Sequence, residues 1–339
     1  MDHIILALDS SAVGGIETHV LVLAEGLIAT GHRATILRLR NHGPHPMDAL
    51  ARARGLPLQV LSDQGIGLGT WLRRNRASLL HTHGYRAGII GRLTRPGHGL
   101  PVVSTFHNGD RGRGKLAAYT ALDRLTARLS INIAVSEDIA RSLPRPVSVI
   151  DNFVPMPAER AEKGTAIGFV GRLSREKGPD LFVELARRHP GQRFVMFGDG
   201  PMRGTIEATA PENLSVMGAV PGMHDHWPEL GLLVMPSRQE GLPMAALEAM
   251  SNGIPVAAFA VGGLPRLVGD GVSGYIAGAG DMDTLSRQVA AFCAAGTGQR
   301  EAMQRAARQR IHETCSVEAR LPDVLKIYDR AMAGGRPAC

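Results

Sequence analysis

The sequence predicts an α/β protein of two domains, each built on a parallel sheet covered by helices. The chain has 339 residues, enough for two domains of ~150 residues each. Short apolar runs alternate with longer amphipathic stretches in both halves, which is typical of a parallel sheet with helices on both faces. Between the halves, residues 151–157 contain two prolines, and hydrophobic periodicity is lost as far as Lys163. This segment is predicted to be a linker.

The first half shows this alternation along its whole length. Its apolar runs predict strands at residues 4–8, 34–39, 78–81, 102–106 and 131–135. Helical spacing of apolar residues predicts helices at 18–29, 116–129 and 137–143. We therefore expect a Rossmann-like first domain, residues 1–155.

The second half repeats the architecture without repeating the sequence. Strands are predicted at residues 166–170, 193–197, 232–235 and 256–258, and helices at 180–188, 202–210 and 244–250. Residues 281–328 are mostly helical in pattern. We expect a second Rossmann-like domain over residues 156–315, and a helical tail, residues 316–339, that packs back toward the first domain.

Charge is distributed unevenly over the two halves. The net charge is +7, and residues 1–155 hold 18 basic and 11 acidic residues, whereas residues 156–339 hold 20 of each. A basic first domain would attract anionic lipid headgroups, a phosphorylated acceptor or nucleic acid. The other interpretation is an ordinary arginine-rich surface. Because aromatic residues do not interleave with the basic ones, we do not expect a nucleic acid partner.

Cysteine usage and hydropathy favour a cytoplasmic protein. The cysteines are Cys293, Cys315 and Cys339, with no CxxC pair, so neither a disulfide framework nor a zinc site is expected from them. No apolar run approaches the ~20 residues that span a bilayer. The first apolar run lacks a preceding positive region, which predicts a buried strand rather than a signal peptide.

Two glycine-containing segments open predicted helices at the ends of strands. Gly14 and Gly15 follow the first strand, and amides at a helix N-terminus can bind a phosphate, although a tight turn is an equal alternative. Residues 171–178 (GRLSREKG) follow the 166–170 strand, with Gly171, Arg172 and Lys177 among them. Two cations beside a helix N-terminus suit a diphosphate. The alternative is a solvated loop.

A third segment combines carboxylates with backbone amides. Glu240 lies after the 232–235 strand, Gly241 and Leu242 would offer N–H groups, and Pro243 suits the first position of a helix that carries Glu248. Carboxylates accept hydrogen bonds from sugar and ribose hydroxyls. Either carboxylate alone could instead be an ordinary helix-terminus or helix-face group. Residues 198–201 (GDGP) form either a turn or a wall of the same site.

Histidines mark two further strand ends. His107 follows the 102–106 strand and could donate to a sugar hydroxyl, or it could be structural. His81 and His83 form an HxH pair, but the sequence shows no third ligand for a metal. We therefore predict no metal site.

Taken together in this order, the motifs resemble those of family 4 glycosyltransferases, which have the GT-B fold. The second half carries the specific part: 171–178 (GRLSREKG), 197–201 (FGDGP), 240–248 (EGLPMAALE), 254–256 (IPV), 261–265 (VGGLP) and 271–274 (GVSG). The first half is similar more generally, at Gly14-Gly15, 81–84 (HTHG), 105–107 (TFH) and 135–137 (VSE).

The resemblance implies two Rossmann-like domains that face each other across a cleft, and a retaining, metal-independent hexosyl transfer with no cofactor. It implies a UDP or GDP sugar as donor and a glycan, lipid-linked or small-molecule acceptor, in cell-surface polysaccharide or glycolipid biosynthesis. The protein would be cytoplasmic, with peripheral contact to an anionic membrane through the basic first domain.

The resemblance also implies roles for single residues. Arg172 and Lys177 would hold the diphosphate, and Glu248 the ribose. Glu240, with the amides of Gly241 and Leu242, would hold the donor sugar. His107 would contact that sugar, and Gly15 the diphosphate.

One position departs from the family pattern, because Arg266 follows the VGGLP segment where the family often has Glu. Donor selection at this position is therefore open. An epimerase or phosphorylase on the same fold, or a non-catalytic binding protein, are the alternatives to a glycosyltransferase. A phosphorylase would need a lysine for pyridoxal phosphate, and the chain has four lysines, of which Lys177 is already assigned to phosphate.

Overall fold

The computed structural model describes residues 2–10, 14–107, 115–144, 146–158, 164–220 and 222–334. The chain forms two compact units. Unit 1 comprises Met1–Phe153 and Val317–Cys339, and unit 2 comprises Val154–Ser316. The C-terminal segment thus belongs to the same unit as the N-terminal half, and the sequence places the corresponding boundaries at residues 155 and 315.

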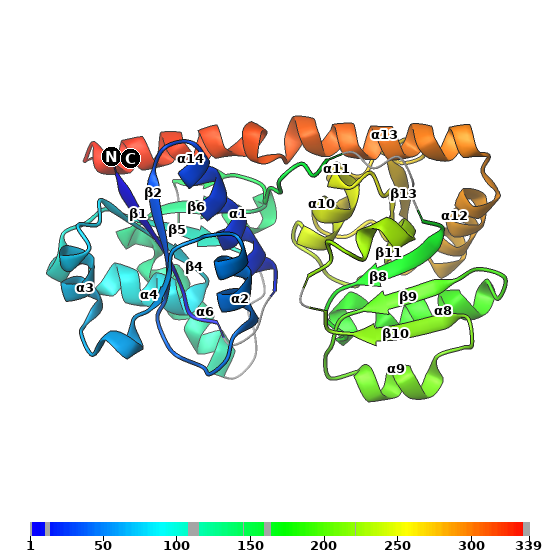
Figure 1. The fold of residues 1–339 in the computed structure, drawn as a ribbon, viewed down its shortest axis with the longest axis horizontal. Coiled ribbons are helices and arrows are strands. Elements are labelled where there is room, and N and C mark those ends of the chain that lie inside the picture. Colours follow the sequence, from blue (N-terminus) through cyan, green and yellow to red (C-terminus); the bar gives the residue numbers. More distant parts are fainter. Residues whose placement is uncertain are drawn as a thin grey trace. The chain divides into compact units, whose positions relative to one another are not determined.

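Unit 1 contains a seven-stranded parallel sheet in the order β3-β2-β1-β4-β5-β6-β7 (Figure 1). Its strands are β1 (His3–Leu8), β2 (Arg33–Arg38), β3 (Leu58–Val60), β4 (Leu79–His83), β5 (Val102–Phe106), β6 (Ile131–Ala134) and β7 (Val147–Val149). The central strand β1 is buried at every residue, as expected for a parallel strand covered on both faces.

Helices cover both faces of this sheet. They are α1 (Gly15–Ala29), α2 (Pro46–Ala53), α3 (Leu68–Arg74), α4 (Tyr85–Leu93), α5 (Arg95–His98), α6 (Lys115–Thr126), α7 (Glu137–Arg141) and α14 (Val317–Met332). Ile4 and Leu6 of β1 pack in a core with α1, α2 and α14, whereas Ile5 packs on the other face with α3 and α4. Successive side chains of β1 therefore pack into two different hydrophobic cores, one on each face of the sheet.

Helix α14 packs closely on α1 because Gly26 leaves room for it. A Cβ at Gly26 would lie 3.0 Å from a methyl group of Val317 and 3.1 Å from one of Leu321. The Tyr328 side chain of α14 is also buried in this core. The contact fixes the C-terminal helix to the first sheet.

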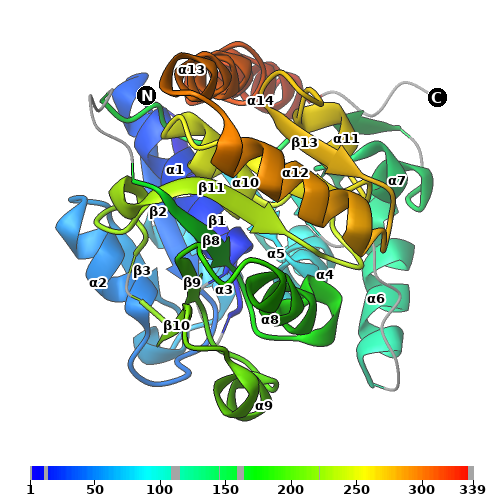
Figure 2. The same ribbon diagram turned by 90° about the vertical axis from the view of Figure 1, so that its right-hand side faces the viewer.

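Unit 2 contains a six-stranded parallel sheet in the order β10-β9-β8-β11-β12-β13. Its strands are β8 (Ala166–Val170), β9 (Phe194–Phe197), β10 (Leu214–Gly218), β11 (Leu230–Met235), β12 (Val256–Phe259) and β13 (Gly274–Ala277). Its helices are α8 (Pro179–Arg188), α9 (Arg203–Thr209), α10 (Met244–Ser251), α11 (Leu264–Leu267), α12 (Met282–Ala294) and α13 (Thr297–Thr314). Figure 2 looks on the face covered by α8 and α12, and α10, α11 and α13 cover the opposite face.

The predicted α/β class and its two Rossmann-like sheets are confirmed. The sequence patterns miss the helices α2, α3, α4, α5 and α11 and the short strands β3, β7, β10 and β13. They also end β4 at His81, although it runs to His83. Cys293 and Cys315 are free thiols, and Cys339 lies outside the described residues. Among the described residues, no helix is both long and apolar enough to cross a bilayer.

Candidate functional site

The strand order of each sheet reverses direction once along the chain. In unit 1 the reversal lies between β1 and β4, and in unit 2 between β8 and β11. Open parallel sheets bind ligands outside the carboxyl ends of their strands at such a switch point. The predicted site residues follow β1, β5, β8 and β11, at the carboxyl edge of their own sheet.

In unit 2, the loops after β8 and β9 are joined backbone to backbone. The amide of Gly171 donates to Phe197 O (3.0 Å), and the amide of Leu173 donates to Asp199 O (2.9 Å). Gly198 has φ +138°, and a Cβ there would lie 1.8 Å from Gly171 O. Only glycine permits this approach, so residues 198–201 support the 171–178 loop from one side. Arg172 is exposed within that loop.

Lys177 and Glu240 meet at this edge. Lys177 ends a 3-10 turn, Arg175–Lys177, and its Nζ donates to Glu240 Oε2 at 2.7 Å. Ser237 Oγ donates to the other carboxylate oxygen, Oε1, at 2.8 Å. The side chain of Glu240 is 2% exposed and that of Lys177 30%. The carboxylate is thus fixed and buried, while the lysine side chain beside it remains partly exposed.

The loop after β11 is held against the start of α8. Arg238 donates to both carboxylate oxygens of Asp180, at 2.9 and 2.7 Å, and this hydrogen bonding lowers the pKa of Asp180. Gly178 has φ +70°, and a Cβ there would lie 2.2 Å from Pro236 O. The glycine therefore allows the 171–178 loop and the β11 loop to touch.

The loop after β12 lies against the segment Glu240–Gly241. Gly262 has φ +55°, with a Cβ position 2.3 Å from Glu240 O, and the amide of Gly263 donates to Gly241 O at 2.7 Å. These close backbone contacts explain the glycines of the VGGLP segment, residues 261–265. Arg266 follows in α11, where it is exposed.

Helix α10 begins at Met244, the first residue of the helix predicted over 244–250. Pro243 is the N-cap residue, with φ −74° and ψ 129°, and Met244 is the first helical residue. Proline at this place has the extended backbone of a cap rather than helical dihedrals, so the expectation of a first helical position is wrong. Leu242 is buried, and Glu248 lies half-buried on α10.

In unit 1, histidine side chains gather at the carboxyl ends of β4 and β5. His81 is structural: its Nδ1 pairs with Tyr328 OH (2.6 Å) and its Nε2 with Thr105 Oγ1 (2.7 Å). His83 Nδ1 lies 3.2 Å from Nε2 of His107. His19 of α1 completes the group, with ring centroids 5.6 Å from His83 and 5.0 Å from His107.

Burial keeps these rings uncharged. It lowers the pKa of His19 to about 4 and that of His81 to about 3. The pKa values of His83 and His107 are well below the ordinary value of 6.5, first through burial and then through neighbouring imidazoles. At neutral pH the cluster therefore consists of neutral imidazoles, which can donate and accept hydrogen bonds.

A cavity of about 150 Å³ adjoins His83 and His107. Its charged lining is balanced: three arginines, Arg86, Arg92 and Arg124, and three acidic residues, Asp9, Glu17 and Asp123. Glu17 accepts the amide of Gly14 at 2.7 Å, so a carboxylate already occupies the positive end of α1. Residues 11–13, which precede Gly14, lie outside the described residues.

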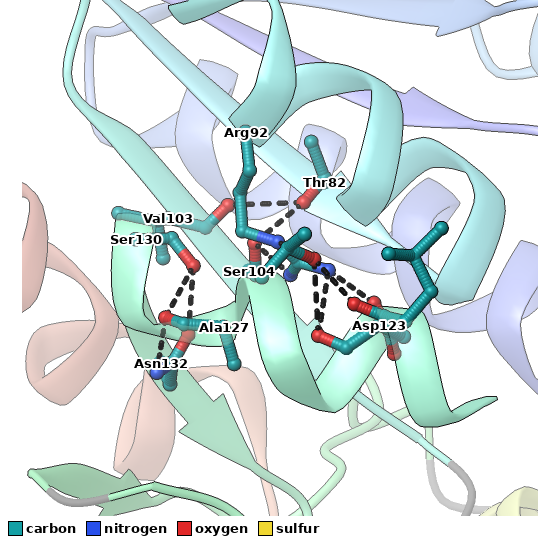
Figure 3. A network of polar contacts seen from close by, with 10 residues as sticks. Thr82, Arg92, Val103, Ser104, Asp123, Ala127, Ser130 and Asn132 are labelled. Atoms are coloured by element: carbon teal, nitrogen blue, oxygen red, sulfur yellow. Dashed lines mark hydrogen bonds and ion pairs between the residues drawn. The ribbon is translucent and has the colours of Figure 1, made fainter. Parts of the chain in front are cut away.

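Arg92 is one of the residues that line this cavity, and Figure 3 shows the polar network around it. Its buried guanidinium forms an ion pair with Asp123 and donates to Ser104 Oγ and Thr126 Oγ1, both at 3.1 Å. Burial lowers the pKa of Arg92 and raises that of Asp123. The network ties α4 to α6 and β5.

The sequence patterns miss His19, Glu17, Ser237 and the Arg92–Asp123 pair. His19 and Glu17 could have been found, because they lie in the first turns of the helix that Gly14-Gly15 opens. Arg92 and Asp123 are 31 residues apart in separate helices, and nothing local joins them.

Two parallel sheets with Rossmann-like strand order, each with glycine-containing or polar loops at its carboxyl edge, define a protein of the GT-B fold. The HepE protein of Anabaena in complex with UDP-glucose has a TM-score of 0.80 and 17% identity, covering 98% of this chain and 99% of that one. The TarM protein of S. aureus, in a complex that contains UDP, has a TM-score of 0.80 and 13% identity, covering 97% and 100%.

Family models match nearly the whole chain. Residues 13–156 match Glycosyltransferase Family 4, and residues 155–310 match Glycosyl transferases group 1. The chain belongs to the family 4 glycosyltransferases.

Two curated relatives illustrate its sequence neighbourhood. The D-inositol 3-phosphate glycosyltransferase of Mycobacterium marinum is 26% identical, over 75% of this chain and 64% of that protein. The 2-deoxystreptamine N-acetyl-D-glucosaminyltransferase of Streptomyces fradiae is 29% identical, over 94% of this chain and 88% of that one. The chain thus spans about two thirds of the first relative and most of the second.

Proposed function

We propose that this protein transfers a hexose from a nucleoside diphosphate sugar to a hydroxyl-bearing acceptor, with retention of anomeric configuration. The observation that carries the proposal is the pairing of Lys177 with the buried Glu240 at the carboxyl edge of the second sheet. A fixed carboxylate beside a partly exposed lysine suits a sugar joined to a diphosphate. Three complexes of HepE, with UDP, UDP and glucose, and UDP-glucose, favour a UDP sugar over a GDP sugar.

In this proposal, unit 2 holds the donor. Arg172 and Lys177 bind the diphosphate and stabilise the charge that develops as it leaves, which is the main catalytic effect. Glu240, with the amides of Gly241 and Leu242, holds the sugar, and Glu248 holds the ribose. The site uses side chains and amides for leaving-group stabilisation, without a metal or other cofactor.

Unit 1 supplies the remaining groups. His107, as a neutral imidazole, contacts the donor sugar, and the amide of Gly15 the diphosphate. The balanced charges of the cavity beside His107 favour a neutral, hydroxyl-rich acceptor group over a multiply phosphorylated one. The two relatives named above act on inositol 3-phosphate and 2-deoxystreptamine, and both acceptors are substituted cyclohexane polyols. A small cyclitol is therefore the first acceptor to test, with lipid-linked and glycan acceptors of cell-surface synthesis next.

A thermal-shift panel tests the donor half. UDP, GDP and ADP sugars are compared with the free nucleotides, because a ligand that binds the folded state raises the melting temperature. We expect a rise with UDP ligands that Glu248→Ala abolishes. Glu207→Ala, which changes a carboxylate on the exposed face of α9, is the matched control and should keep it. No rise with any nucleotide, or a rise that Glu248→Ala leaves intact, would contradict the donor assignment.

We further propose that unit 1 contacts an anionic membrane surface through α6. Tyr119, Leu122, Leu125 and Leu129 are exposed at helical spacing, and Leu125 is 71% exposed. Between residues 115 and 129 the one carboxylate is Asp123, which is buried against Arg92, while Arg128 is exposed. An apolar stripe bordered by arginine suits the headgroup region of an anionic bilayer, and supports a cytoplasmic protein at the inner membrane face.

Vesicle sedimentation tests this contact. Phosphatidylserine-containing and neutral vesicles are compared at low and physiological salt. We expect binding to the anionic vesicles that Leu125→Glu weakens, while Val272→Glu, at an equally exposed apolar residue of unit 2, leaves it unchanged. Absence of binding at both salt concentrations would rule out the contact, and binding insensitive to Leu125→Glu would exclude α6 as its surface.

A further inference from the structure

Three histidines from three separate elements meet at the carboxyl edge of the first sheet. His19 comes from α1, His83 from the end of β4 and His107 from the residue after β5. Each offers a ring nitrogen, and these three atoms lie within 4.8 Å of one another. Of the HxH pair in the sequence, only His83 belongs to this group. Both ring nitrogens of His81 are hydrogen-bonded, one to Tyr328 and the other to Thr105.

The spacing of the rings fits a single tetrahedral ion. Around a zinc ion with Zn–N bonds of about 2.0–2.1 Å, two ligating nitrogens lie about 3.3 Å apart and two imidazole centroids about 5.2 Å apart. His83 Nδ1 and His107 Nε2 are 3.2 Å apart. The three centroid distances are 5.0, 5.4 and 5.6 Å.

Two ring nitrogens of the cluster lack a hydrogen-bond partner among the described residues. These atoms, His19 Nδ1 and His83 Nε2, are buried, and buried polar atoms normally have a partner. For His19 Nδ1, the missing partner indicates an ion or water at the site; His83 approaches His107 through its other nitrogen, Nδ1. The rings of His19 and His83 are almost fully buried, at 4% and 1% exposure.

The position is also accessible from one side. His83 and His107 line the cavity of about 150 Å³ together with Asp9 and Glu17. Three imidazoles around a tetrahedral ion leave one coordination position for water or a ligand oxygen, and two of these three imidazoles face that cavity.

We propose that His19, His83 and His107 bind one divalent transition-metal ion of the zinc and cobalt class. Imidazole ligands select such ions over magnesium and calcium, which prefer oxygen. The proposed transfer reaction does not require this ion, and His107, which approaches His83 through Nε2, keeps Nδ1 for the donor sugar assigned to it above.

Cobalt absorption spectroscopy tests the site without measuring activity. The purified chain, stripped with a chelator, is titrated with Co²⁺, whose visible bands are intense in tetrahedral and weak in octahedral coordination. We expect one equivalent to give the intense spectrum and Zn²⁺ to displace it. His19→Gln should weaken Co²⁺ binding by at least the ~10–100-fold that loss of an outer partner costs a metal site. His83→Gln is the second variant, and His107→Gln is left out because that residue also serves the proposed donor site.

His3→Gln is the matched control. His3 is also buried, but its Nδ1 pairs with Asn75 O and its Nε2 with Thr35 Oγ1, both at 2.9 Å, so its loss should leave the cobalt spectrum unchanged. A wild-type protein that shows only the weak octahedral spectrum, or a tetrahedral spectrum that survives both His19→Gln and His83→Gln, would overturn the proposal. The wild-type titration decides the matter even if a variant fails to fold.

Discussion

Lys177 and Glu240 are 63 residues apart in the sequence, yet Lys177 Nζ lies 2.7 Å from Glu240 Oε2. The lysine follows β8 and the glutamate follows β11, the two strands on either side of the switch point of the second sheet. The ion pair fixes the ammonium, so the proposed binding of a diphosphate would require little further ordering of this side chain.

Lys177→Ala is expected to slow sugar transfer by roughly 10²–10³-fold, by analogy with loss of one donor to a developing oxyanion. The measurement is kcat/KM with a UDP sugar, with melting temperature as a check on folding. Lys326→Ala removes another of the four lysines, an exposed one on α14, and should leave the rate unchanged. A Lys177→Ala variant with near-normal turnover would show that this ammonium does not bind the leaving diphosphate.

Gly178→Ala is expected to destabilise unit 2 by more than the ~1–2 kcal/mol that a left-handed backbone costs an L-residue. The excess arises because the new Cβ would lie 2.2 Å from Pro236 O, which pushes apart the loops that carry Lys177 and Glu240. The midpoints of urea unfolding of Gly178→Ala and of a control variant, Gly204→Ala, are compared. Gly204→Ala on α9 meets no atom within 4 Å and should not lower the midpoint. Equal midpoints for the two variants would contradict the close contact at Gly178.

Asp123→Ala leaves the Arg92 guanidinium buried without its carboxylate. Breaking a buried ion pair in this way typically costs 3–5 kcal/mol, and we expect a loss of about that size. It is measured as a lower urea midpoint and a lower melting temperature. Glu184→Ala breaks the pair with Arg188 on the surface of unit 2 and should change stability little, because water replaces the lost partner. Similar small effects for both variants would show that Arg92 is hydrated in solution.

The sequence predicts the central strands and the loops 171–178 and 198–201 because both have local signals. Apolar runs mark β1, β5, β8 and β11, and the glycines of 171–178 and 198–201 mark loops whose backbones touch. Short strands leave little signal: β3 and β7 have three half-buried residues each, and no apolar run distinguishes them from loops.

Contacts between side chains on different helices and strands could not be predicted from the sequence. The Ser237 hydroxyl that orients Glu240, the Arg92–Asp123 pair and the three-histidine cluster all depend on which strands become neighbours. His19, His83 and His107 come together because α1 begins, and β4 and β5 end, at the carboxyl edge of the same sheet. The HxH pattern misleads here, because only His83 of that pair joins the cluster and the other two histidines, His19 and His107, lie on different elements.

The Asp180–Arg238 pair makes a pH-dependent contribution to stability. Hydrogen bonding from Arg238 lowers the pKa of Asp180 below its ordinary value of 3.8. At a pH between the pKa of Asp180 in the folded chain and its higher pKa in the unfolded chain, the unfolded chain binds a proton at Asp180 that the folded chain does not. The stabilisation is therefore present above pH ~4 and is lost as pH falls through the folded-state pKa. Asp180 is partly exposed, so the contribution at neutral pH is expected to be about 0.2–1 kcal/mol.

Urea midpoints of the wild type and Asp180→Asn at pH 7, 5 and 3.5 measure this contribution. We expect the wild type to be more stable at pH 7 and 5, and the difference to shrink at pH 3.5, where the unfolded aspartate is largely protonated. Asp283→Asn is the control, because that carboxylate is 77% exposed in its pair with Arg188. A difference that stays constant over this range would mean that Asp180 acts through the shape of its hydrogen bonds at the start of α8 and not through its charge.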